Sequence, residues 1–147
     1  LIILRLKYFI LNISLWRSII MRFAYTILYV EDVKKTVQFY KNAFGFELKF
    51  QHEQGDYAEL ESGQTTIALS SFELIRSLGK KPQRAEIHSP NFELAFVTDQ
   101  LEQDLRQAKQ AGAKEIQAIE RMPWGQSIAY VEDINGFLIE LCTPMMI

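Results

Sequence analysis

The chain has 147 residues, of which 48% are hydrophobic and 23% are charged, proportions typical of one globular domain long enough to bury a core. Acidic residues outnumber basic ones by 18 to 16, which argues against a nucleic-acid partner because phosphate binding depends on clustered lysine and arginine. The single cysteine, Cys142, excludes an internal disulfide bond and favours a cytoplasmic location.

Residues 1–20 form an apolar leader that precedes the first regular pattern. Its longest uncharged run, residues 8–16, is nine residues long, whereas a membrane-spanning helix needs roughly 20. We therefore expect no membrane partner and interpret the leader as an artefactual start or a disordered segment. An amphipathic helix on a membrane surface and a targeting signal are the alternatives. The folded domain is expected to occupy residues 21–147.

The first half of the domain predicts one strand, one helix and three further strands. The β-branched and aromatic run at residues 23–30 is typical of a buried strand. Asp32 is a candidate helix N-cap, and apolar residues then recur at helical spacing until Gly45. Turn signals separate the three later strands, which are predicted at residues 46–54, 57–62 and 65–71.

The second half follows a short helix expected within residues 71–78 and a polar, proline-punctuated linker at residues 80–90. A strand is predicted at residues 92–98. A capping box from Asp99 to Glu102 is expected to begin a helix that Gly112 ends. The remaining strands are predicted at residues 114–121, 126–131 and 137–142.

The two halves share one pattern. An offset of 68 residues places Leu28 on Phe96 and Val33 on Leu101, so each half reads βαβββ, as a duplication would produce. A chance match between two common strand–helix units is the alternative. The predicted repeats are residues 21–79 and 91–143.

Three segments carry longer motifs. They read LYVEDVKKTVQFYKNAFGFEL near the start, FELAFVTD in the middle and PWGQSIAYVEDINGFLIELCTP near the end. In this order they resemble the opening, middle and ending of domains of the vicinal oxygen chelate superfamily, which includes glyoxalases, bleomycin-resistance proteins and extradiol dioxygenases. The resemblance implies an α+β fold in which two βαβββ units form a curled mixed sheet around a cavity. It also implies a homodimer, because such cavities are usually completed by a second chain.

The resemblance also implies where a metal would bind. Metal-dependent members take one ligand from the first and one from the fourth strand of each unit, positions that correspond here to Tyr25, Ala68, Glu93 and Glu140. Alanine has no ligand atom, and a phenol is a poor ligand for the divalent ions of such sites. We therefore expect neither a metal nor another cofactor, and we assign no catalytic residue.

The candidate site is a ligand pocket lined by aromatic and acidic side chains. Strand alternation places Tyr25, Glu93 and Glu140 on the cavity side. It also places Trp124, Gln126 and Tyr130 together on one face of the strand that precedes the last one. The alternatives are that the two glutamates are solvated strand charges and that the aromatic residues belong to the core. Both histidines, His52 and His88, are expected at the surface.

The leading functional hypothesis is a metal-independent protein similar to the bleomycin-resistance branch. Two carboxylates beside aromatic rings would favour a flat, cationic small molecule. The main alternative is a metal-dependent lyase or isomerase resembling lactoylglutathione lyase, with Glu93 and Glu140 as partial ligands. A purely structural or regulatory role is the third possibility, because this fold supports many functions.

Overall fold

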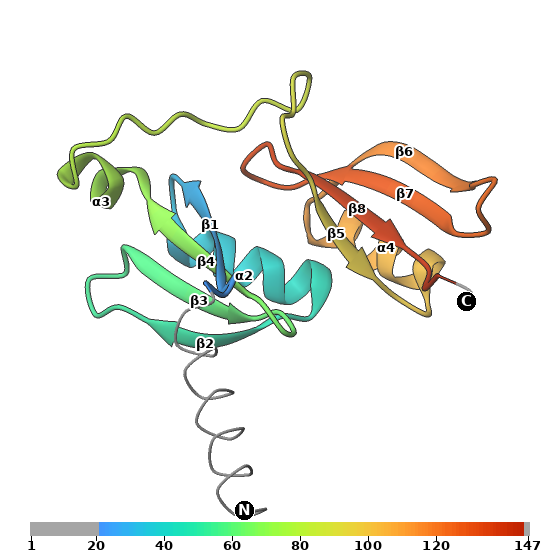
Figure 1. Ribbon diagram of the computed structural model, residues 1–147, viewed down its shortest axis with the longest axis horizontal. Helices are drawn as coiled ribbons and strands as arrows, with labels where there is room; N and C mark the ends of the chain where they lie inside the picture. The colour runs from blue at the N-terminus through green and yellow to red at the C-terminus, as the bar shows by residue number, and fades with distance from the viewer. Residues whose placement is uncertain (1–20, 146–147) are drawn as a thin grey trace, which may run out of the picture.

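The computed structural model describes residues 21–145, so the predicted leader lies outside the described residues. Within these residues, eight strands and two helices form two βαβββ units placed side by side, and a third, short helix lies in the connection between them (Figure 1). This arrangement confirms the expected fold class. The first unit comprises β1 (Tyr25–Val30), α2 (Val33–Phe44), β2 (Glu47–Gln51), β3 (Tyr57–Glu61) and β4 (Thr66–Ser71).

The second unit repeats this order after a connection that contains one short helix. That helix, α3 (Phe72–Ser77), begins at Ser71, whose hydroxyl accepts from the Leu74 amide at 3.0 Å. A stretch without regular structure then crosses to the second unit. The second unit comprises β5 (Leu94–Val97), α4 (Leu101–Ala111), β6 (Lys114–Arg121), β7 (Ser127–Glu132) and β8 (Leu138–Cys142).

Each unit contains one four-stranded mixed sheet with the same topology. The strand orders are β1-β4-β3-β2 and β5-β8-β7-β6. The first and last strands of each unit pair in parallel, and the other pairs are antiparallel. The parallel pairing follows from the helix after the first strand, because parallel neighbours need a crossover connection.

The capping residues predicted from the sequence are confirmed for α2, but the one predicted for the start of α4 is wrong. Asp32 Oδ1 accepts from the Lys35 amide at 2.9 Å, and Gly45 ends α2 in a left-handed conformation with φ of 75°. The capping box predicted from Asp99 is wrong: α4 begins after Gln100, and no side chain caps it. The Thr98 hydroxyl accepts from the Gln100 amide and bonds to the carboxylate of Asp104, one turn into the helix.

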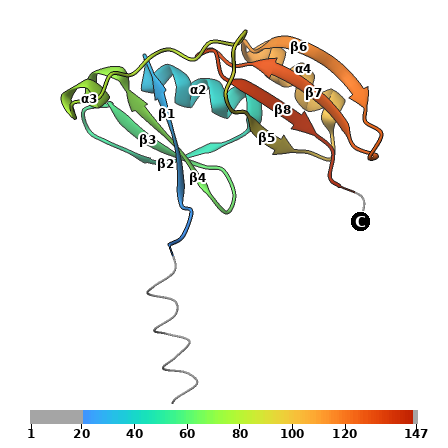
Figure 2. The same ribbon diagram turned by 45° about the horizontal axis from the view of Figure 1, so that its top comes forward.

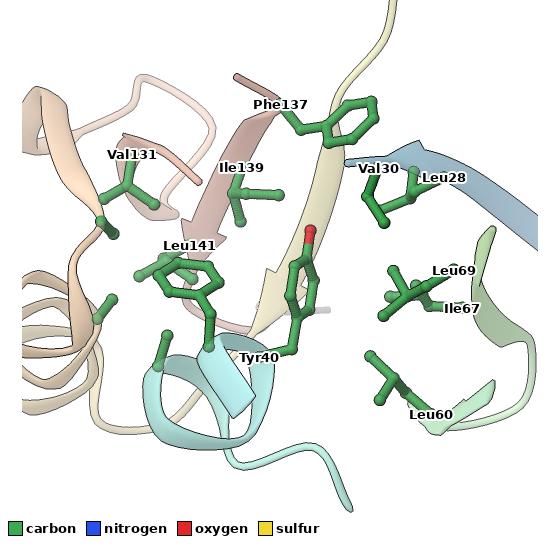
Figure 3. Packing of buried hydrophobic residues seen from close by; sticks show 14 of the residues in the cluster. Leu28, Val30, Tyr40, Leu60, Ile67, Leu69, Val131, Phe137, Ile139 and Leu141 are labelled. Atoms are coloured by element: carbon green, nitrogen blue, oxygen red, sulfur yellow. The ribbon is translucent and has the colours of Figure 1, made fainter. Parts of the chain in front are cut away.

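Helices α2 and α4 pack against each other and cover the same side of the two sheets (Figures 1 and 2). The alternate strand residues that face them form one buried cluster with Tyr40 at its centre (Figure 3). Within residues 21–145, no helix covers the opposite side of both sheets, which we call the open face. The cluster contains Leu28 and Val30 of β1, Leu60 of β3, Leu69 of β4, Val131 of β7, and Ile139 and Leu141 of β8.

A buried hydrogen-bond network joins the two units. The Tyr40 hydroxyl of α2 donates to Asp133 Oδ2 at 2.9 Å, and Asn135 Nδ2 donates to Thr36 Oγ1 at 3.1 Å. Asp133 Oδ1 also accepts from the Asn135 and Phe137 amides, both at 2.8 Å. Burial raises the pKa of Asp133, and these hydrogen bonds counteract the shift. The β7–β8 turn of the second unit is therefore fixed to the helix of the first.

None of the helices within residues 21–145 combines the length and the apolar character needed to cross a bilayer.

Candidate ligand-binding site

The centre of the candidate site is an acid pair formed by Glu93 and Glu140 on the open face of the second unit. Glu140 lies on β8, and Glu93 lies just before β5, which is shorter than predicted. Ala95 of β5 is opposite Glu140, so Glu93 is two residues away on the same face. Desolvation raises the pKa of Glu93, and so do the charge of Glu140 and a hydrogen bond to it. The two carboxyl groups therefore share one face of the sheet, and each affects the proton affinity of the other.

Tyr130 completes this cluster. It lies opposite Glu140 in the β7–β8 ladder, and its hydroxyl donates to Glu140 Oε2 at 2.7 Å. This hydrogen bond, followed by burial, holds the pKa of Tyr130 well above its usual value. Tyr130 therefore remains a protonated donor that orients Glu140.

Cys142 lies on the same face of β8, two residues beyond Glu140. Burial, together with Glu140, raises the pKa of Cys142 to about 11. Its thiol is therefore a poor nucleophile at neutral pH.

Two of the six predicted residues, Trp124 and Gln126, form a separate pair. Trp124 Nε1 donates to Gln126 Oε1, and Gln126 Nε2 donates to the Thr143 carbonyl, both at 2.8 Å. Gln126 precedes Tyr130 by four residues, which is about 13 Å along a strand. Trp124 is 58% exposed. A small ligand held by the acid pair would therefore have to extend along β7 to reach this indole.

Tyr25 lies on the open face of the other unit. It contributes to the raised pKa of Tyr57 on β3, which reaches about 12 mainly through burial and a hydrogen bond to Glu59. The Tyr57 hydroxyl donates to Glu59 Oε1 at 3.0 Å, and Glu59 lies opposite Ala68. Sequence reasoning missed this second tyrosine–glutamate pair. The alternation in YAELE was the signal that could have found it.

A hollow with a volume of about 530 Å³ lies at the junction of the two units. We call it the junction cavity. None of the six predicted residues is among those that line it, and the linker forms one wall. No short-range sequence pattern marks such a cavity, because its walls come from three distant segments. Its lining comprises Ile27 to Tyr29, Gln83 to Glu86, Ser89 to Phe92 and Gly136 to Leu138.

The donor atoms at the metal positions do not fit a metal site. Ala68 offers no ligand atom, Tyr25 offers only a phenol, and Glu140 already accepts a hydrogen bond from Tyr130. Within residues 21–145, no three His, Cys, Asp or Glu side chains lie close enough to hold a metal ion. Both histidines are exposed, as expected, and His52 pairs with Asp56 at 2.8 Å.

Comparison with known proteins supports the resemblance seen in the motifs. Residues 23–146 match the family model described as a glyoxalase-like domain. The uncharacterized protein YraH of Bacillus subtilis (strain 168) is 30% identical over 118 residues, which cover 78% of this chain and 91% of that protein.

Two solved structures share the fold at low sequence identity. A glyoxalase-related enzyme from Fulvimarina pelagi superposes with a TM-score of 0.74 at 17% identity, over 85% of this chain and 89% of that one. A glyoxalase/bleomycin resistance protein/dioxygenase family enzyme from Burkholderia phytofirmans PsJN has a TM-score of 0.71 at 18% identity, over 86% of this chain and all of the other.

Proposed function

Because the chain belongs to the glyoxalase-like domain family of the vicinal oxygen chelate superfamily, we propose that it binds a small, cationic aromatic molecule on the open face of its second unit. The function is binding, as in the bleomycin-resistance branch, and requires no metal. The observation that carries this proposal is the strand register that places Glu93 and Glu140 on one face, where the Tyr130 hydroxyl donates to Glu140 Oε2.

An acid pair of this kind favours a cation for a simple electrostatic reason. Two neighbouring carboxylates repel each other, so one of them retains a proton above its usual pKa. An amine or guanidinium placed between them would replace that proton and remove the repulsion. The ring of Tyr130 adds a surface for a cation–π contact of about 0.5 to 2 kcal/mol, depending on desolvation.

We further propose that the protein is a homodimer in which a second copy covers the open faces. Large apolar side chains remain uncovered on these faces in the single chain: Tyr25 is 50% exposed and Val97 64%. Burying such side chains is the main driving force for association. Light scattering at micromolar concentration should give the mass of two 17.1 kDa chains. A monomer mass would remove this part of the proposal.

The binding proposal is tested by a thermal-shift screen of matched cationic and anionic aromatic compounds. Cations should raise the melting temperature of the wild type, and Glu93→Gln or Glu140→Gln should weaken that effect. Glu61→Gln is the control, because Glu61 is an exposed carboxylate on the other sheet. Preference for anions, or an unchanged response in both site variants, would refute the proposal.

Metal content separates this proposal from the lyase or isomerase alternative. We expect elemental analysis of the purified protein to find no stoichiometric zinc, nickel or iron, because two of the four ligand positions hold Tyr25 and Ala68. About one metal ion per chain, lost in Glu140→Ala, would favour the enzyme instead.

A further inference from the structure

The junction cavity and the acid pair are neighbours on the same surface. Leu94 lies opposite Ile139, so Glu93, one residue earlier, lies beside Leu138. Leu138 lines the cavity, and so does Phe92, the residue before Glu93. Leu138 and Glu140 are two residues apart on one face of β8, which is about 7 Å. A ligand whose charged end contacts the acid pair would therefore extend directly into the cavity.

The walls of the cavity suit a flat apolar body. Ile27 and Tyr29 of β1 line it, and so do Phe92 and Phe137, whose ring centroids are 5.8 Å apart. A volume of about 530 Å³ lies within the roughly 300 to 1,000 Å³ typical of small-molecule sites.

The linker wall carries a fixed positive charge. Arg84 lines the cavity, and its Nη2 donates to the Ile134 carbonyl at 3.1 Å, which anchors the guanidinium. Arginine has five N–H donors, so most remain available to a ligand. Glu86 is the one carboxylate among the residues that line this cavity, and its Oε1 already accepts from the His88 amide at 3.1 Å.

The close approach of the linker to the β7–β8 turn keeps this wall in place. A Cβ atom added at Gly136 would lie 2.3 Å from the Ala85 carbonyl oxygen, so only glycine permits the contact. The turn is itself fixed to α2 through Asp133 and Tyr40. The cavity is therefore built from segments that hydrogen bonds and packing hold together.

We propose that the ligand spans both features and is amphoteric. Its cationic end lies at the acid pair, its aromatic body fills the junction cavity, and a carboxylate or similar anionic group at its far end pairs with Arg84. The cationic end at the acid pair rests on the proposed function. The aromatic body and the anionic end add the shape and the second charge of the ligand. Arg84 is thus a specificity residue that distinguishes amphoteric compounds from simple aromatic amines.

Three probes that share one bicyclic ring test this inference by calorimetry on the full chain. They are 2-naphthylmethylamine, 6-(aminomethyl)-2-naphthoic acid and 2-naphthoic acid. The amphoteric probe should bind about five- to tenfold more tightly than the amine, as one added arginine–carboxylate pair would produce. The purely anionic probe should bind most weakly.

Two variants locate the ligand. Arg84→Gln should make the amphoteric probe and the amine bind equally, and Ile27→Trp should weaken both by filling the cavity. Both side chains are exposed, and an unchanged melting temperature without ligand confirms folding. Arg106→Gln is the matched control, because Arg106 is an exposed arginine on α4 that does not line this cavity.

The outcomes separate this inference from the proposed function. If the amine binds and Glu140→Gln abolishes that binding, but Arg84→Gln and Ile27→Trp change nothing, the cavity does not hold the ligand and only this inference fails. If Arg84→Gln weakens the amphoteric probe but Glu140→Gln does not, the cavity is a separate site and the spanning arrangement is wrong. If no aminated probe binds the wild type, the proposed function itself fails.

Discussion

Replacing Tyr40 by phenylalanine tests the buried network that joins the two units. The substitution keeps the ring, which is fully buried, and removes the hydroxyl that donates to Asp133 Oδ2 at 2.9 Å. Asp133 is 3% exposed, and the other two hydrogen bonds of its carboxylate are both accepted by Oδ1. Oδ2 therefore loses its partner, and water has little access to replace it.

Loss of a hydrogen bond to a buried charged acceptor costs about 1.5 to 3 kcal/mol. For a domain of this size that cost corresponds to a fall in melting temperature of about 3 to 12 °C. Chemical denaturation and calorimetry of Tyr40→Phe measure both quantities. The control is Tyr29→Phe, because within residues 21–145 the Tyr29 hydroxyl makes no hydrogen bond, and this variant should change stability by less than about 0.5 kcal/mol. Equal stability of Tyr40→Phe and the wild type would show that the network does not stabilise the fold.

Two further predictions concern the turn and the acid pair. Gly136→Ala should lower the free energy of unfolding by about 3 kcal/mol or more, because the added Cβ would clash with Ala85. The control is Gly63→Ala, which is also at positive φ but has nothing within 4 Å, so it should lose only the stability that backbone strain costs. Similar losses in the two variants would rule out the clash. Because the folded chain raises the pKa of Glu93 above its ordinary value, it binds that proton more tightly than the unfolded chain does. The resulting stability is present at low pH and is lost as pH rises through the raised pKa. The wild type should therefore lose stability relative to Glu93→Gln over this weakly acidic range. A stability difference between the two proteins that does not change with pH would contradict the assigned shift.

Local signals in the sequence predicted most of the secondary structure. Asp32 and Gly45 act directly on neighbouring backbone groups, so the limits of α2 followed from residue type alone. The prediction that Asp99 caps α4 is wrong because Gln100 occupies the N-cap position. Asp99 has a suitable side chain for a cap but lies one residue too early. Which residue begins a helix depends on how the chain leaves the preceding strand, and the sequence pattern does not specify that angle.

Strand alternation predicted which side chains share the open face but not which of them meet. Glu93, Glu140 and Tyr130 come together because parallel and antiparallel pairing around β8 aligns their strands. Tyr25 occupies the equivalent position of the other sheet, and Trp124 lies before the start of β7. These separations depend on register and on strand length.

The junction cavity was beyond sequence reasoning for a different reason. It depends on where the irregular linker crosses the β7–β8 turn, and hence on the contact between Ala85 and Gly136. Such a contact between residues 51 positions apart leaves no periodic signal.

Proton release on cation binding is the most direct test of the acid pair. The full chain is titrated with 2-naphthylmethylamine at weakly acidic pH in two buffers of different ionisation enthalpy. Because a cation beside the pair favours two ionised carboxylates, the wild type should release protons when it binds the amine, and Glu93→Gln should release none. Glu140→Gln should bind the amine at least about tenfold more weakly, a difference of about 1.4 kcal/mol in binding free energy. Binding without proton release, at the same affinity in the wild type and both variants, would contradict the account.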